Sequence, residues 1–78
     1  MGGHQSIVEI EGFGYSEEEA RISLGCALLA KFHVRLEYNR GMKRWGIFQQ
    51  QKFYPVWFNR FLDAGKGEYI YRAFIEVK

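Results

Sequence analysis

The amino-acid sequence predicts a small α+β domain, and three of its features carry that prediction. One segment has the start signals and the periodicity of a helix, segments on both sides of it alternate apolar and polar residues, and Gly or Pro stands between them. The chain of 78 residues is 47% hydrophobic and 18% aromatic, which is rich for its length. This composition supplies one hydrophobic core and argues against a disordered chain.

The first predicted strand covers residues 6–13. Apolar and acidic side chains alternate from Val8 to Glu11, which is the pattern of a strand with one buried face. Gly12 and Gly14 are expected to break this strand before the helix begins.

The main helix is predicted to start at Ser16. Three glutamates follow it, so the Ser16 hydroxyl can cap the first turn, Glu19 can close a capping box, and the acids complement the helix dipole. The side of the helix expected to face a sheet carries Ala20, Leu24, Ala27, Leu28 and Phe32. Residues 24–32 are apolar nearly all round, so we expect a second helix or a second subunit to cover the outer side.

Three further strands and a short helix are predicted after it. Residues 33–38 alternate and form the second predicted strand, and residues 43–54 are expected to form one long third strand. Pro55 and the aromatic i, i+4 pairs beyond it predict a short second helix over residues 55–64. Residues 68–78 are the last predicted strand.

The expected order is therefore β-α-β-β-α-β in a single domain of residues 6–78, with residues 1–5 disordered. One antiparallel sheet of about four strands with both helices on one face, a ferredoxin-like or related plait, satisfies this order best. If the second helix does not form, the order becomes β-α-β-β-β, a sheet curled around one helix.

The stretch of residues 40–62 is the candidate binding segment. It holds seven large aromatic side chains and five basic ones with no acid. The formal charge is −3 in residues 1–37, +5 in residues 38–62 and zero in residues 63–78, which gives the net charge of +2. Aromatic rings stack on unpaired bases while interleaved Lys and Arg neutralise phosphates. The predicted nucleic-acid-binding residues are Arg40, Lys43, Arg44, Trp45, Phe48, Gln50, Lys52 and Tyr54.

A protein partner is the alternative, because Trp, Tyr and Arg are also the residues most enriched at interface hot spots. This second hypothesis is a protein-binding module or an inhibitor of a host factor, of the type found in phages and mobile elements, acting as a homodimer. In either case, four residues of the stretch are expected to pack in the core: Trp57, Phe58, Phe61 and Leu62.

No pattern of a catalytic, metal-binding or cofactor-binding site is recognised, and we expect a protein that is not an enzyme. Cys26 is the one cysteine, and it is expected to be a buried, inert thiol because neither His4 nor His33 is placed beside it by sequence. The longest mostly apolar run, residues 24–32, is too short to span a bilayer. With no signal peptide recognised, a cytoplasmic protein without membrane contact is expected.

Overall fold

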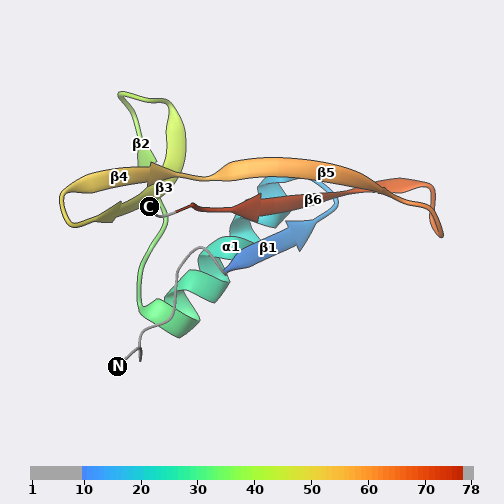
Figure 1. Ribbon diagram of the computed structural model, residues 1–78, viewed down its shortest axis with the longest axis horizontal. Helices are drawn as coiled ribbons and strands as arrows, with labels where there is room; N and C mark the ends of the chain where they lie inside the picture. The colour runs from blue at the N-terminus through green and yellow to red at the C-terminus, as the bar shows by residue number, and fades with distance from the viewer. Residues whose placement is uncertain (1–9, 77–78) are drawn as a thin grey trace.

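The computed structural model describes residues 10–76 of the chain. Within that range, one helix and two three-stranded antiparallel sheets follow the order β1 (Glu11–Gly14), α1 (Glu17–Phe32), β2 (Glu37–Asn39), β3 (Arg44–Gln49), β4 (Lys52–Pro55), β5 (Trp57–Asp63) and β6 (Glu68–Phe74). The first sheet has the strand order β1-β6-β5 and the second β2-β3-β4. The α+β class is confirmed, but the single four-stranded sheet with two helices is not what this part of the chain forms (Figure 1).

The main helix begins and caps itself as the sequence predicts. Ser16 Oγ accepts a hydrogen bond from the Glu19 N–H at 3.1 Å, and the Glu19 carboxylate accepts one from the Tyr15 N–H at 2.9 Å. At the other end, His33 takes the left-handed conformation with φ 56° and its N–H donates to carbonyls of the last turn. Both ends of the helix are therefore satisfied by local groups.

Ser16→Ala is expected to lower the free energy of unfolding by about 1 kcal/mol, because the Glu19 N–H loses its acceptor. Ser16→Asp, which keeps an acceptor in the same place, is the matched control and should unfold within about 0.5 kcal/mol of the wild type. Urea unfolding followed by circular dichroism measures both. Equal losses for the two variants would show that the cap does not stabilise α1.

β1 runs through the two glycines that were expected to end it, so that expectation is wrong. A Cβ added at Gly12 would collide with the backbone of Leu24 and would lie 2.5 Å from the Ala20 carbonyl oxygen. A Cβ added at Gly14 would meet the helix one turn earlier. The glycines are thus what allows α1 to lie directly on the β1 backbone.

The predicted long third strand is a hairpin. β3 and β4 pair antiparallel from Gln49 opposite Lys52, and Gln50 and Gln51 form the two-residue turn between them. Both turn residues have positive φ, 52° and 66°, as a type I′ hairpin turn requires. This turn usually contains Asn-Gly or a similar pair, so two glutamines gave no signal for it.

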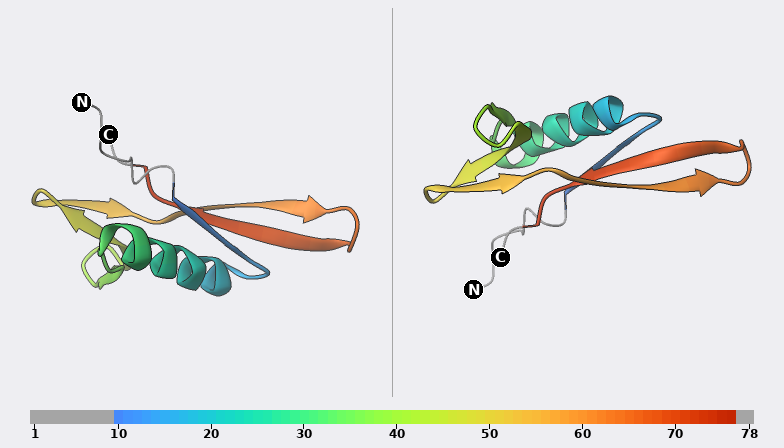
Figure 2. Two further views of the ribbon diagram at one scale, coloured as in Figure 1. Left: turned by 90° about the horizontal axis from the view of Figure 1, so that it is seen from below. Right: turned by 90° about the horizontal axis from the view of Figure 1, so that it is seen from above.

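The predicted second helix is also wrong, because residues 57–63 form β5. β5 pairs with β6 along its whole length, from Trp57 opposite Phe74 to Asp63 opposite Glu68. The turn between them is closed by Asp63, whose carbonyl accepts the Gly67 N–H at 2.7 Å and whose carboxylate accepts the Gly65 N–H at 3.0 Å. The hairpin extends beyond the N-terminal end of α1 (Figure 2).

The remaining boundaries differ in detail. Only the last part of the predicted second strand belongs to a sheet, as β2, which pairs with β3. Residues 6–9 of the first predicted strand, the disorder expected for residues 1–5, and the last two residues of the final strand lie outside the described range.

The core lies between α1 and the sheets. The buried apolar residues of the described range come from the helix, from both sheets and from the segments next to them: Ile10, Ala20, Leu24, Leu28, Ile47, Tyr54, Val56, Ala73 and Ile75. The face predicted for the helix is confirmed, since three of its positions are fully buried and two are partly buried against the core. The two sheets thus share one core on one side, and no helix of residues 10–76 lies on their other side.

Candidate partner-binding surface

The sheet surface turned away from α1 is continuous across both sheets, and we call it the outer face. β4 passes into β5 through Val56, which is buried at 2% exposure on the helix side, so Pro55 and Trp57 on either side of it point outward. Val56 also extends the β3–β4 ladder, since its N–H donates to the Trp45 carbonyl at 2.8 Å. Figure 2 shows α1 on one side of this joined strand.

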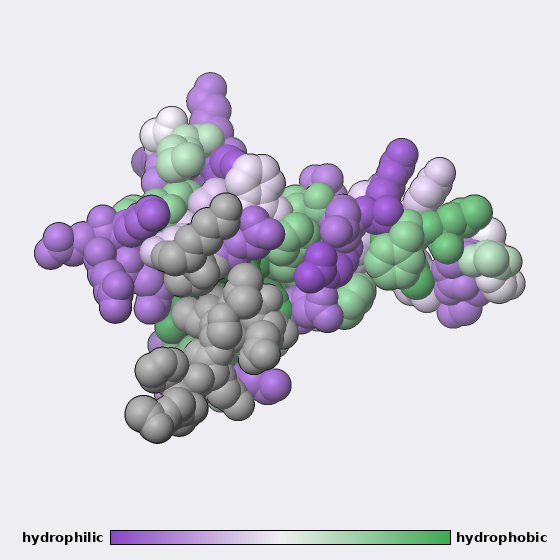
Figure 3. Space-filling view, viewed as in Figure 1, coloured by the Kyte–Doolittle hydropathy of each residue, from purple (hydrophilic) through white to green (hydrophobic). Residues whose placement is uncertain are grey.

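Aromatic and aliphatic side chains dominate the outer face. Strand register and alternation place there Phe13, Phe48, Phe53, Trp57, Phe61, Ile70 and Phe74. Phe13, Phe48, Trp57 and Phe61 keep between 45% and 51% of their surface exposed. Hydrophobic side chains gather over the distal half of the β5–β6 hairpin, at the right of Figure 3, whereas the β3–β4 turn at the left is hydrophilic. A monomeric protein rarely exposes so many large rings on one face without a partner.

Two arginines lie over rings of this face. The Arg44 guanidinium stands 4.3 Å from the Trp57 ring centroid, and its Nη2 donates to the Val56 carbonyl at 2.8 Å. The Arg72 guanidinium lies 4.1 Å from the Phe74 ring centroid and forms an ion pair with Glu11. Each cation–π contact is worth about 0.5–1 kcal/mol at an exposed site. The two arginines therefore fix the rings in place and are already engaged within the protein.

Charges on the outer face do not favour a polyanion. The strand positions that face outward carry two arginines, Arg44 and Arg72, and four acids, Glu11, Glu37, Asp63 and Glu68. The +5 charge of residues 38–62 is divided between places. Arg40, Lys43 and Arg44 lie in or beside the β2–β3 turn, whereas Lys52 begins β4 and Arg60 lies on the helix side of β5.

The eight predicted site residues are accordingly divided. Arg44 and Phe48 lie on the outer face, and Phe48 packs on Phe53 with ring centroids 5.1 Å apart. Trp45 lies on the helix side, half-buried, edge to face with Tyr38 at 5.5 Å. The other five are also dispersed: Arg40 and Lys43 are exposed in the β2–β3 turn, Gln50 is at the β3–β4 tip, Lys52 is 5.4 Å from the Tyr54 ring, and Tyr54 is buried.

The outer face also contains residues that sequence reasoning assigned to the core. Trp57, Phe61 and Leu62 were expected to be packed, yet each is 45% exposed or more, and only Phe58 of that group packs against the core. Trp57 and Phe61 are outward because they alternate with Phe58 and Leu62 in a strand. The sequence contains no signal for this, because a spacing of four residues fits one side of a helix and one face of a strand equally.

A small apolar pocket adjoins the outer face where β1 ends. Phe13, Gly14, Tyr15 and Ile70 line a cavity of about 220 Å³. The Tyr15 hydroxyl beside it accepts a hydrogen bond from Lys66 Nζ at 3.2 Å, which raises the pKa of the Lys66 ammonium above its ordinary value. The pocket is large enough for one aliphatic or aromatic side chain of a partner.

Polar and metal-ligating side chains of the described range are neither buried nor clustered. Across residues 10–76, no polar or charged side chain is buried and no three His, Cys, Asp or Glu side chains gather as a metal site would need. Cys26 is exposed on α1, so the expectation that it is buried is wrong. No helix in that range is long and apolar enough to cross a membrane.

No protein-family model, curated protein or solved structure matches this chain.

Proposed function

We propose that this chain is a non-catalytic binding domain that holds a protein partner on its outer face. The observation that carries the proposal is an exposed aromatic face whose own charges are slightly acidic. Trp57 and Phe61 supply rigid apolar area at its centre, and the pocket beside Phe13 can receive an anchor side chain. Hydrophobic burial drives such an association and needs no net positive field.

Nucleic-acid binding is the second candidate, and one observation favours it. Arg40 and Lys43 are both exposed in the β2–β3 turn, next to the Arg44–Trp57 pair, so a single strand can pass from a phosphate contact to a stacked base. Against it stand the outward acids, which repel phosphates. A protein partner therefore fits the whole face better than a nucleic acid does.

Site-specific photo-cross-linking tests the proposal directly. A photoreactive phenylalanine analogue is placed at Phe48 or at Phe61, which are outward residues of different sheets, and the cells of origin are irradiated. We expect one protein to be joined at both positions, in an adduct that nuclease treatment leaves unchanged. The same analogue at Lys31, exposed at the end of α1, is the control and should give no such adduct.

Two results would contradict the proposal. Adducts that nuclease converts to the size of the free protein would make nucleic acid the partner. Adducts that contain only a second copy of this chain would make the outer face a dimer interface. The predicted homodimer would then form through the sheets and not through the apolar side of α1.

A further inference from the structure

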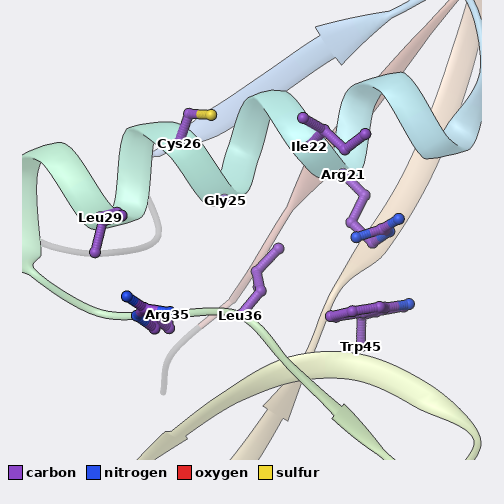
Figure 4. Close-up of a pocket in the computed structure, with 8 residues that line it drawn as sticks. All are labelled: Arg21, Ile22, Gly25, Cys26, Leu29, Arg35, Leu36 and Trp45. Carbon is purple, nitrogen blue, oxygen red and sulfur yellow. The ribbon is translucent and has the colours of Figure 1, made fainter.

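A groove lies on the other side of the molecule, between α1 and the strands of the second sheet. Its walls come from the middle of α1, from the segment before β2 and from β3, and it encloses about 300 Å³. Figure 4 shows Arg21 and Leu29 extending from α1 toward Trp45 and Arg35, with Leu36 between them. The lining residues are Arg21, Ile22, Gly25, Cys26, Leu29, Arg35, Leu36 and Trp45.

The helix wall of the groove is apolar and partly unfilled. Ile22 and Leu29 are 50% and 45% exposed, and no second helix covers them within residues 10–76. Gly25 stands between them, and a Cβ built there would lie 3.3 Å from Leu36 Cδ1. A glycine in a helix interior weakens the helix, so its presence here is not explained by helix stability. The missing side chain leaves the groove open.

Both charged residues of the groove are arginines. The Arg21 guanidinium lies 4.1 Å from the Trp45 ring centroid, and Arg35 is exposed at the opposite end. Glu17 and Glu18 precede Arg21 by about one turn, but neither is in an ion pair with it. Neither guanidinium donates a hydrogen bond to another described residue. Two arginines thus frame an apolar floor that carries no acid.

We propose that this groove binds a short acidic segment of a protein partner, with an apolar side chain between two carboxylates. The apolar side chain would lie over Gly25 against Leu36, and the carboxylates would pair with Arg21 and Arg35 in charge-assisted hydrogen bonds. The complementary charge is what selects this occupant over an uncharged apolar one. The site is separate from the outer face, so it stands or fails independently of the function proposed above.

Selection from a displayed library of random 12-residue peptides on the immobilised protein tests this inference. We expect the enriched peptides to share an apolar residue flanked by Asp or Glu. A synthetic peptide of the consensus should bind the Arg21→Gln/Arg35→Gln variant at least about tenfold more weakly than the wild type. Arg40→Gln/Lys43→Gln changes the net charge equally outside the groove and should bind within about twofold of the wild type.

Gly25→Ala separates binding from folding. The added methyl enters the groove while removing a helix-weakening glycine, so the urea midpoint should rise as the consensus peptide's affinity falls. Cys26 gives a further readout, because it is the one cysteine of the chain and lines the groove. Saturating peptide should slow its modification by the neutral reagent iodoacetamide at least about fivefold.

Four outcomes would overturn the inference. The first is that the enriched peptides lack acidic residues, the second that the consensus peptide binds the two double variants equally, and the third that it binds without protecting Cys26. The first would show that charge does not select the peptide. The second would show that the two arginines do not bind it, and the third that it binds elsewhere than in the groove. A library that yields no enriched peptide at all would also overturn it, because the groove would then hold no such segment.

Discussion

Gly12→Ala is expected to lower the free energy of unfolding of this protein strongly. The new Cβ would have to enter the backbone of α1 at Leu24 and Ala20, and backbone cannot move aside as a side chain can. We expect a loss of about 3 kcal/mol or more. A chain of this length has a total free energy of unfolding of about 4–12 kcal/mol, so the loss removes a large share of it.

Urea unfolding followed by tryptophan fluorescence measures this effect. The matched control is Gly65→Ala in the β5–β6 turn, where an added Cβ would lie 3.5 Å from Asp63 Oδ1, an ordinary contact. That variant should unfold within about 0.5 kcal/mol of the wild type. If Gly12→Ala unfolded at the wild-type urea concentration, α1 would not be lying on β1.

Trp57→Ala is expected to weaken the partner bound at the outer face at least about 30-fold, or about 2 kcal/mol. Trp57 lies where β4 passes into β5, it is 45% exposed, and Arg44 holds its ring in place, which is the setting of an interface hot spot. Phe61→Ala should show a loss of the same kind. Calorimetric titration with the cross-linked partner, produced separately, measures both at 50 and 200 mM salt.

The charge variant Arg40→Gln/Lys43→Gln is the control for these losses, and its affinity should change less than about threefold. A nucleic-acid partner would reverse the pattern, because each lost phosphate contact reduces the slope of log affinity against log salt by about 0.7–0.9. If the charge variant lost more affinity than Trp57→Ala, the second candidate function would replace the first.

The second hairpin shows why sequence reasoning misplaced part of the fold. Trp57 and Phe61 are four residues apart, a spacing that puts them on one side of a helix and equally on one face of a strand, because four is a multiple of two. The i, i+4 pairs therefore do not distinguish the two structures. Residues 57–63 become a strand because β6 supplies a partner along their whole length, and a partner outside the segment does not show in the segment's own pattern.

The main helix was predicted correctly because its signals are local. Ser16 Oγ accepts a hydrogen bond from the Glu19 N–H, and the Glu19 carboxylate accepts one from the Tyr15 N–H. These bonds join residues at most four apart, so the helix start does not depend on distant contacts. The Gln50-Gln51 turn is the opposite case. Neither residue prefers positive φ, but both adopt it because the pairing of β3 with β4 leaves only two residues for the turn.

The predicted site residues are not all brought together, for a similar reason. Strand alternation puts Trp45 and Tyr54 on the helix side and Phe48 on the other, and the β3–β4 turn carries Gln50 away from Arg40 and Lys43. Of the eight predicted residues, Phe48 and Arg44 lie on the outer face. The composition predicted exposed aromatic side chains, and the strand register determined which aromatic residues are exposed.

The pairing of β1 with β6 has a consequence for the order in which the protein folds. The other strand pairs join neighbours in the chain, whereas Glu11 opposite Phe74 closes a loop of 74 − 11 = 63 residues. Closing that loop costs about 2 kcal/mol more chain entropy than closing a four-residue turn. We therefore expect the two hairpins and the helix to assemble early, and docking of β1 with α1 onto β6 to be the slow step that sets the folding rate.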